Sequence, residues 1–269
     1  MESIVRFRHC GKLIYTFTNR EESHSSAGEP GGTRRSPAGV TRERCPLCGD
    51  RLSFRLLDAP VAVSCPFSNG HETPCAFLIS SRSGPTSISE QNESELHVGI
   101  SNSEGVVFSY TESGVQRQQQ GWEKSLTIPL VTPSNQPSNT LVTPSNHASA
   151  ALVTPSNRLS AALVTPSNHP SPPLLPASVI RSWDRRLETF SSQDRWTTDR
   201  FSEEGEFGSC CYGFALSFIN EVRRSEVMEV ISQNTFTLRY VLPTIHCSSK
   251  YLSLYHYIHQ HGYYYSTTV

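Results

Sequence analysis

A six-residue motif, Leu-Val-Thr-Pro-Ser-Asn, occurs four times in this chain and separates its ordered-looking residues into two groups. The copies span 130–135, 141–146, 152–157 and 163–168, so each begins 11 residues after the one before it. An 11-residue period is compatible with a right-handed helical supercoil. Helix is excluded here because every copy contains a proline, which removes a backbone donor and pushes the preceding threonine towards extended conformations.

The repeats also carry too few core-forming residues for a β-solenoid, since each copy offers one Leu-Val pair. We interpret them as a tandem expansion that lengthened a loop; a docking array for a partner is the alternative. A fold tolerates such a loop because closure costs only about 0.6 kcal/mol per doubling of length. We therefore expect residues 131–180 to form a disordered insert. Residues 19–42 are rich in Ser, Gly, Pro, Glu and Arg, and this composition predicts a second mobile loop.

Composition limits the function classes. The formal net charge of −1 gives no global electrostatic basis for binding nucleic acid or an anionic membrane. The N-terminal residues lack the apolar run of a signal peptide, and no apolar stretch approaches the ~18–20 residues that span a bilayer. We expect a cytoplasmic or nuclear protein, not secreted, with an unknown protein partner or substrate, no nucleic acid and no membrane span. Its eight cysteines then favour zinc or catalysis over disulfides.

The segment Cys45-Pro46-Leu47-Cys48-Gly49 has the spacing of a zinc knuckle, in which the glycine relaxes the turn so that both thiolates reach one ion. A thioredoxin-like redox motif is the rival, but no βαβ pattern surrounds this one. Cys10, which also precedes a glycine after a predicted strand, is the expected third ligand. The fourth stays open among His9, Cys65, His71 and Cys75, and adjacent His9 and Cys10 binding one ion would be strained. A ribbon that has lost its metal is the alternative.

Hydrophobic patterns place the remaining elements. Strands are expected within 4–18, 96–100 and 106–110, a short amphipathic helix at 183–190 and the strongest helix at 211–224. Further on, the pattern predicts a short element ending at Pro243, a helix at 250–260 and a terminal strand at 263–265.

A candidate thiol site links two of these elements. Cys211 lies in the first turn of the strongest helix, where the helix dipole lowers a thiol pKa. His97, on the first strand of a predicted hairpin, is the candidate base, and Ser109 on the partner strand is a candidate orienting group. The alternatives are a buried core cysteine, a structural strand histidine and a surface serine.

The order of a strand histidine followed by a cysteine that opens a helix resembles the circularly permuted papain-like proteins, which include the lecithin:retinol acyltransferase family and the desumoylating isopeptidases. In those families the cysteine commonly follows an asparagine, where this chain has Cys210. The acyltransferase group has a second histidine where this chain has Ser109.

A further set of segments is distinctive: 6–10, 45–49, 56–60, 66–71, 96–100, 114–117, 121–123, 183–184 and 211–220. Through these segments the chain closely resembles the makorin opposite-strand proteins, over nearly all of its length outside residues 19–42 and 131–180. That family has no established activity, and its members have a short connection at the position of the repeats. The resemblance therefore implies that the repeats are an insertion.

These observations predict an α+β fold in two domains. Residues 1–60 are expected to form a zinc-ribbon-like module, and residues 61–269 a permuted papain-like domain with an antiparallel sheet and a central helix. Two functions remain open: a thiol-dependent peptidase or acyl-transfer hydrolase using Cys211 and His97, or a catalytically inactive papain-like interaction module.

Overall fold

The computed structural model describes six stretches of the chain: residues 1–18, 44–54, 59–81, 96–131, 174–201 and 210–266. The predicted loop at 19–42 lies outside these stretches, as do the repeats apart from residues 130–131. Within the predicted insert, however, Val131, Leu174, Leu175 and Val179 are buried in the core. The prediction that all of 131–180 lacks packing is therefore wrong at both ends, because these apolar side chains belong to the fold.

The larger of two sheets has the strand order β4-β9-β5-β6-β7-β8, and every neighbouring pair is antiparallel. Its strands are β4 (Phe67–Ser68), β5 (Ala76–Ser81), β6 (Leu96–Ser101), β7 (Val107–Thr111), β8 (Gly114–Gln118) and β9 (Ser125–Pro129). A short 3-10 helix, η1 (Gly70–Glu72), lies between β4 and β5.

Side chains alternate between the two faces of this sheet, and each face carries a cluster of buried residues. On one face, Phe77, Val98 and Ile100 join the main core together with α2 (Cys211–Ser225). On the other face, a smaller cluster comprises Ala76, Leu78, Val107 and Trp122.

The main core is covered by α2 and by α1 (Trp183–Ser191), with η4 (Ala177–Ser182), η5 (Asp194–Trp196) and η6 (Thr198–Arg200) around α1. The apolar face of α2 is fully buried, as its sequence pattern predicts. Rings of Phe190, Trp196, Phe214 and Phe218 pack against one another with centroids 5.1–5.4 Å apart where α1 and η5 meet α2. This aromatic packing fixes the position of α2 over the sheet.

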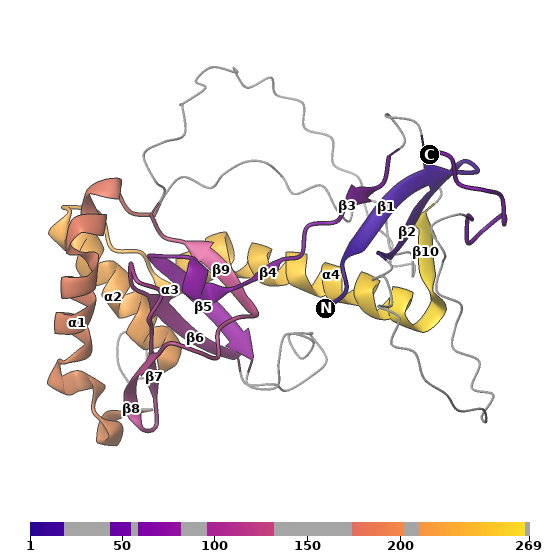
Figure 1. Ribbon diagram of the computed structural model, residues 1–269. Coiled ribbons are helices and arrows are strands. Elements are labelled where there is room, and N and C mark those ends of the chain that lie inside the picture. The colour runs from indigo at the N-terminus through magenta and orange to yellow at the C-terminus, as the bar shows by residue number, and fades with distance from the viewer. Residues whose placement is uncertain (19–43, 55–58, 82–95, 132–173, 202–209, 267–269) are drawn as a thin grey trace, which may run out of the picture.

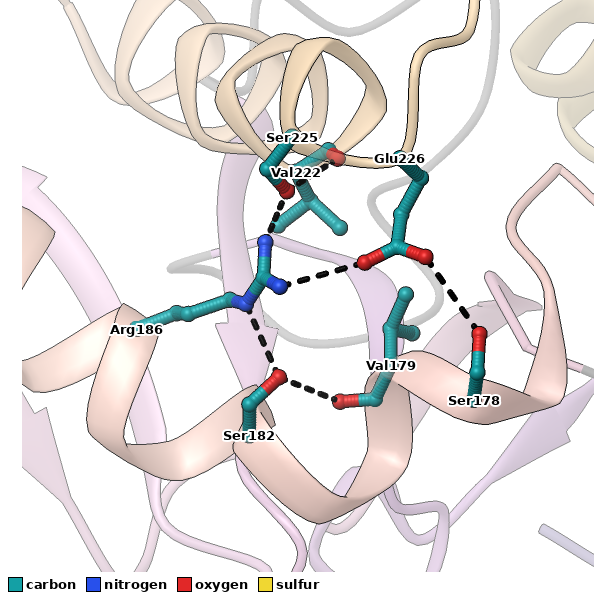
Figure 2. Close-up of polar contacts among 7 residues, drawn as sticks. All are labelled: Ser178, Val179, Ser182, Arg186, Val222, Ser225 and Glu226. Carbon is teal, nitrogen blue, oxygen red and sulfur yellow. Dashed lines mark hydrogen bonds and ion pairs between the residues drawn. The ribbon is translucent and has the colours of Figure 1, made fainter.

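A polar clamp holds the end of α2 in place, as Figure 2 shows. Arg186 of α1 donates to the Ser182 hydroxyl at 2.8 Å and to the Glu226 carboxylate at 3.1 Å, and it also donates to the hydroxyl of Ser225. Ser178 donates to the other oxygen of Glu226. The guanidinium thus joins η4 and α1 to the C-terminal end of α2, where a helix dipole favours positive charge.

The smaller sheet combines strands from both ends of the chain. Its order is β10-β2-β1-β3, comprising β1 (Ile4–His9), β2 (Lys12–Phe17), β3 (Val61–Ala62) and β10 (Tyr263–Ser266). The predicted domain boundary at residue 60 assigned β3 and β10 to the second domain, whereas both belong to this sheet.

One long helical segment connects the two sheets (Figure 1). It consists of α3 (Gln233–Phe236), a π-helical turn η7 (Thr237–Val241) and α4 (Leu242–His261). Its beginning packs into the main core through Phe236 and Val241, and its end packs under the small sheet through Leu254 and Ile258. No helix in the described part of the chain is long and apolar enough to cross a membrane.

The prediction that an element ends at Pro243 is wrong, because the helix continues through this proline. A proline near the start of α4 removes one backbone donor, and the wider π turn just before it accommodates the change. The Thr244 hydroxyl donates to the carbonyl of Tyr240 at 2.8 Å and so satisfies an acceptor within the π turn. The molecule is thus an α+β protein with two antiparallel sheets.

Candidate metal centre and the predicted thiol site

The structure brings the three predicted zinc ligands together and adds a fourth. The side-chain ligand atoms of His9, Cys10, Cys45 and Cys48 all lie within 4.8 Å of one another. His9 ends β1, Cys10 is in the turn to β2, and Cys45 and Cys48 lie in the following described loop. Of the four candidates for the last ligand, His9 is therefore the one that joins the cluster.

The expected strain between neighbouring His9 and Cys10 is relieved by the turn that separates β1 from β2. His9 pairs with Lys12, so Cys10 and Gly11 form a two-residue hairpin turn. Both have positive φ, +43° and +70° respectively, as such turns require. The left-handed conformation of Cys10 directs its thiol to the same group of ligands as the His9 ring.

Backbone hydrogen bonds shape the other half of the cluster. The amide of Gly49 donates to the carbonyl of Cys45 at 2.9 Å, and the amide of Cys45 donates to the carbonyl of Asp50 at 2.8 Å. Gly49 has a φ of +76°, which relaxes the turn as the sequence predicts. The amide of Leu47 points at the Cys45 sulfur, 3.4 Å away, and helps to stabilise a thiolate there.

The distances fit tetrahedral coordination. The Cys10 and Cys45 sulfurs are 4.0 Å apart, and the Cys48 sulfur lies 3.4 Å from Nδ1 of His9. A zinc–sulfur bond of ~2.3 Å places two tetrahedral thiolates about 3.8 Å apart. A Cys₃His set also fills all four coordination positions, which is the pattern of structural zinc rather than catalytic zinc.

The crowded thiols perturb one another. Desolvation and the neighbouring sulfurs of Cys45 and Cys48 raise the pKa of Cys10 to about 11. At Cys45, desolvation acts in the same direction, but the backbone amides of Cys48 and Leu47 outweigh it and lower the pKa. Several thiolates this close repel one another, and a divalent cation removes that repulsion.

The remaining candidates for the fourth ligand lie elsewhere. Cys75 is buried in the main core, and Cys65 is an exposed cysteine next to Tyr251. His71 serves as a structural link: its Nδ1 lies 2.7 Å from the carbonyl of Gly105, and its Nε2 accepts from the amide of Trp122 at 3.3 Å. These contacts place the ring proton on Nδ1, because a carbonyl can only accept.

The predicted thiol site is organised differently, because the His97 and Cys211 side chains belong to opposite faces of the large sheet. The His97 ring packs on Trp122 with centroids 5.6 Å apart, and Trp122 belongs to the cluster on the face away from α2. Cys211 packs against the main core on the α2 face. On β6 it is Val98, one residue after His97, that joins that core.

Cys211 also lacks the environment of an activated thiol. It does open α2, as the sequence predicts. Burial nevertheless raises the pKa of its thiol and outweighs the opposing hydrogen bonding from the Val98 backbone. A raised pKa lowers the thiolate fraction at neutral pH, and the thiolate is the nucleophile.

The Ser109 side chain lies on the same face of the large sheet as His97, but its hydroxyl is hydrogen-bonded to Gln118. It is fully buried, and its hydroxyl donates to the side-chain oxygen of Gln118 at 3.2 Å. The same oxygen accepts from the Trp122 indole nitrogen at 3.0 Å. The described residues therefore place Ser109 and His97 around Trp122, in a packed polar network, and the expected Cys211–His97 dyad is not formed among them.

Sequence reasoning ranked His9 too low, although a signal for it was present. Val5, Phe7 and His9 alternate along β1 and so share one face. Phe7 pairs with Ile14 and packs with Cys45, so the same face carries the knuckle. His9 and Cys10 can then reach the same site if Cys10 adopts a positive φ in the two-residue turn before Lys12, which it does.

Comparison with known proteins identifies the family. Residues 60–145 and 170–258 match the DUF4796 C-terminal family, and the interruption falls within the repeat region. The chain is 30% identical over 264 residues to the human MKRN2 opposite strand protein, covering 98% of this chain and 89% of that protein. No solved structure matches the chain. The chain therefore belongs to the DUF4796 family and to the makorin opposite-strand proteins.

Proposed function

We propose that this chain is a non-catalytic interaction protein in which a zinc-ribbon-like module is built onto a papain-like scaffold. The observation that carries the proposal is the Cys₃His cluster of His9, Cys10, Cys45 and Cys48, whose ligand atoms lie within 4.8 Å of one another. A site with four protein ligands stabilises a fold and leaves no position for a reactive water.

The zinc would fix the knuckle to a small apolar cluster on one face of the small sheet, whose other face packs against α4. Phe7, Ile14 and Cys45 are the buried members of the cluster beside the knuckle, with Leu47 and Leu52 packed against them. So few apolar side chains hold the knuckle only weakly on this face, and small modules commonly use a metal for such a task. Cys45 thus contributes both a ligand and part of the core.

The papain-like part of the proposal is supported by the antiparallel sheet, by α2 packed on one face, and by the sequence order of His97 and Cys211. The same geometry argues against thiol chemistry, since the His97 ring packs on Trp122 and burial raises the pKa of Cys211. A scaffold that keeps the architecture without a working dyad fits a binding role.

Metal analysis tests this proposal. Protein purified without chelators should contain about one zinc per chain, and a cobalt-substituted sample should show thiolate-to-cobalt charge-transfer absorption. Replacement of Cys48 by serine should lower the zinc content well below that value. Cys247→Ser is the matched control, because Cys247 is an exposed cysteine on α4 outside the cluster.

The proposal fails if reduced, folded protein neither contains zinc nor takes it up. It also fails if Cys48→Ser and Cys247→Ser retain the same amount of metal, since the ion would then be bound elsewhere.

A further inference from the structure

Strand pairing places two tyrosines on the same face of the small sheet as the zinc knuckle. Tyr263 and Tyr265 lie opposite Thr16 and Ile14 on β2. Ile14 packs with Cys45 beside the knuckle, and directly opposed residues in an antiparallel pair share a face. Tyr264, between them, is packed against the cluster formed with α4 on the other face.

The two tyrosine rings form an outward stacking surface. β10 is the edge strand of its sheet, and the Tyr263 and Tyr265 rings lie nearly parallel, with centroids 6.5 Å apart and an angle of 28°. Tyr265 is 46% exposed. Nζ of Lys12 lies 5.9 Å from the Tyr265 ring centroid, within cation–π range. A positive charge therefore stands directly beside the exposed ring.

The surroundings are basic although the whole chain is not. In the described residues of the small sheet, the knuckle and α4, the charged side chains are Arg6, Arg8, Lys12, Arg44, Arg51 and Lys250, against Glu2 and Asp50. Arg44 and Arg51 flank the knuckle loop and face each other in an isolated bridge. The ion pairs between described residues all lie around α1 and α2, so none of them uses Lys12, Arg44 or Arg51, although Arg44 donates to the carbonyl of Gly49 at 3.1 Å.

We propose that the surface formed by Tyr263, Tyr265 and Lys12, together with the knuckle cations Arg44 and Arg51, binds single-stranded nucleic acid. Bases would stack on the two tyrosines, and phosphates would contact the three cations, which is how proteins commonly bind single strands. The inference names the partner class of the interaction protein proposed above and rests on that function. The composition argued against nucleic acid because the net charge of the whole chain is near zero, but cations outnumber carboxylates among the described residues of the small sheet, the knuckle and α4.

The main rival occupant is an acidic peptide added to the β10 edge. Such a peptide would use the cations and the strand edge, but it has no planar groups to stack on parallel rings. The arrangement of Tyr263 and Tyr265 therefore favours bases.

Fluorescence anisotropy with labelled single-stranded RNA and DNA of about 12 nucleotides tests the proposal on the zinc-loaded full chain. The double variant Tyr263→Leu, Tyr265→Leu keeps apolar bulk on the strand but removes the rings, and its affinity should fall at least about tenfold, since each stacked base is worth roughly 5- to 150-fold. Tyr265→Phe should bind like the wild type. Tyr257→Leu, on α4, is the matched control and should also leave binding unchanged.

Salt dependence separates the two kinds of contact. Lys12→Ala should reduce the slope of log affinity against log salt by about 0.7, the value for one phosphate of a single strand. The tyrosine variants should weaken binding without changing this slope. Arg239→Ala replaces an exposed arginine in η7, the turn that packs into the main core through Val241, and should change neither affinity nor slope.

The inference is overturned if zinc-loaded protein shows no saturable binding, or if the double tyrosine variant binds as tightly as Tyr257→Leu. It is also overturned in favour of the peptide if polyglutamate competes as well as the oligonucleotide does. Measuring zinc in every sample keeps the two proposals apart: a protein without zinc contradicts the metal proposal, whereas a zinc-loaded protein that ignores oligonucleotides contradicts this inference alone.

Discussion

Two groups of chemistry-bearing residues were expected to converge in this chain, and only one of them does. Cys10 and Cys45 are far apart in sequence, yet the β1–β2 turn and the knuckle loop bring their sulfurs to 4.0 Å. His97 and Cys211 lie on neighbouring elements, yet their side chains belong to opposite faces of the large sheet.

The difference lies in how tightly the local sequence determines the direction of each side chain. Glycines at positions 11 and 49 have positive φ and fix two turns, so the ligands beside them are directed by local geometry. In a strand, by contrast, the face to which a side chain points depends on whether its position is odd or even, so a shift of one position moves it to the opposite face. Val98 points into the main core where a base for Cys211 would have to stand.

The largest expected effect is the loss of hydrogen-exchange protection in the small sheet when zinc is removed. Chelation should remove hydrogen-exchange protection from β1, β2 and β10, because binding of a structural zinc supplies on the order of 10 kcal/mol of folding free energy. Protection in β5 and α2 should persist, since that core does not depend on the metal. Exchange measured by mass spectrometry, with and without chelator, checks this contrast.

Uniform loss of protection over both sheets would show that α4 couples them into one cooperative unit. Unchanged protection in β1 and β2 would show that the cluster holds no structural metal.

A second prediction concerns the face of the large sheet that carries His97. Gly105 has a φ of +84°, and a Cβ at this position would clash with the backbone carbonyl oxygen of His71. Gly105→Ala should therefore cost about 2–4 kcal/mol in the free energy of unfolding, through backbone strain and displacement of the His71 link. Chemical denaturation measures this cost.

Gly121→Ala is the matched control, because Gly121 also has a positive φ, +97°, but a Cβ there would meet no atom of the described residues within 4 Å. The Gly121→Ala variant should lose only the free energy of unfolding that comes from backbone strain at a positive φ, without the clash. Equal costs for the two variants would mean that the loop carrying His71 moves aside freely, and that this face is less firmly packed than the contacts around Trp122 indicate.

Much of the fold follows from local patterns in the sequence. The helix predicted at 211–224 is α2, Cys211–Ser225, and the predicted terminal strand at 263–265 is β10. The partner of that strand could not be predicted, because pairing between the two ends of the chain depends on α4 spanning the distance between the sheets. Periodicity likewise does not assign a face to His97, because β6 is buried on both sides and its alternation is weak.

The smallest expected effect concerns the reactivity of Cys211. Because burial raises the pKa of Cys211, its thiol should be alkylated at neutral pH more slowly than a free cysteine. The alkylation rate should keep rising with pH above the pH at which an ordinary thiol is fully ionised. His97→Ala should leave this rate unchanged within about twofold, since the imidazole lies on the other face and supports no thiolate at Cys211. Mass spectrometry after timed labelling with iodoacetamide follows each cysteine separately, and exposed Cys247 serves as the internal reference. A Cys211 that reacts faster than Cys247, and slows when His97 is replaced, would restore the thiol-enzyme hypothesis and remove the contrast between the two sites.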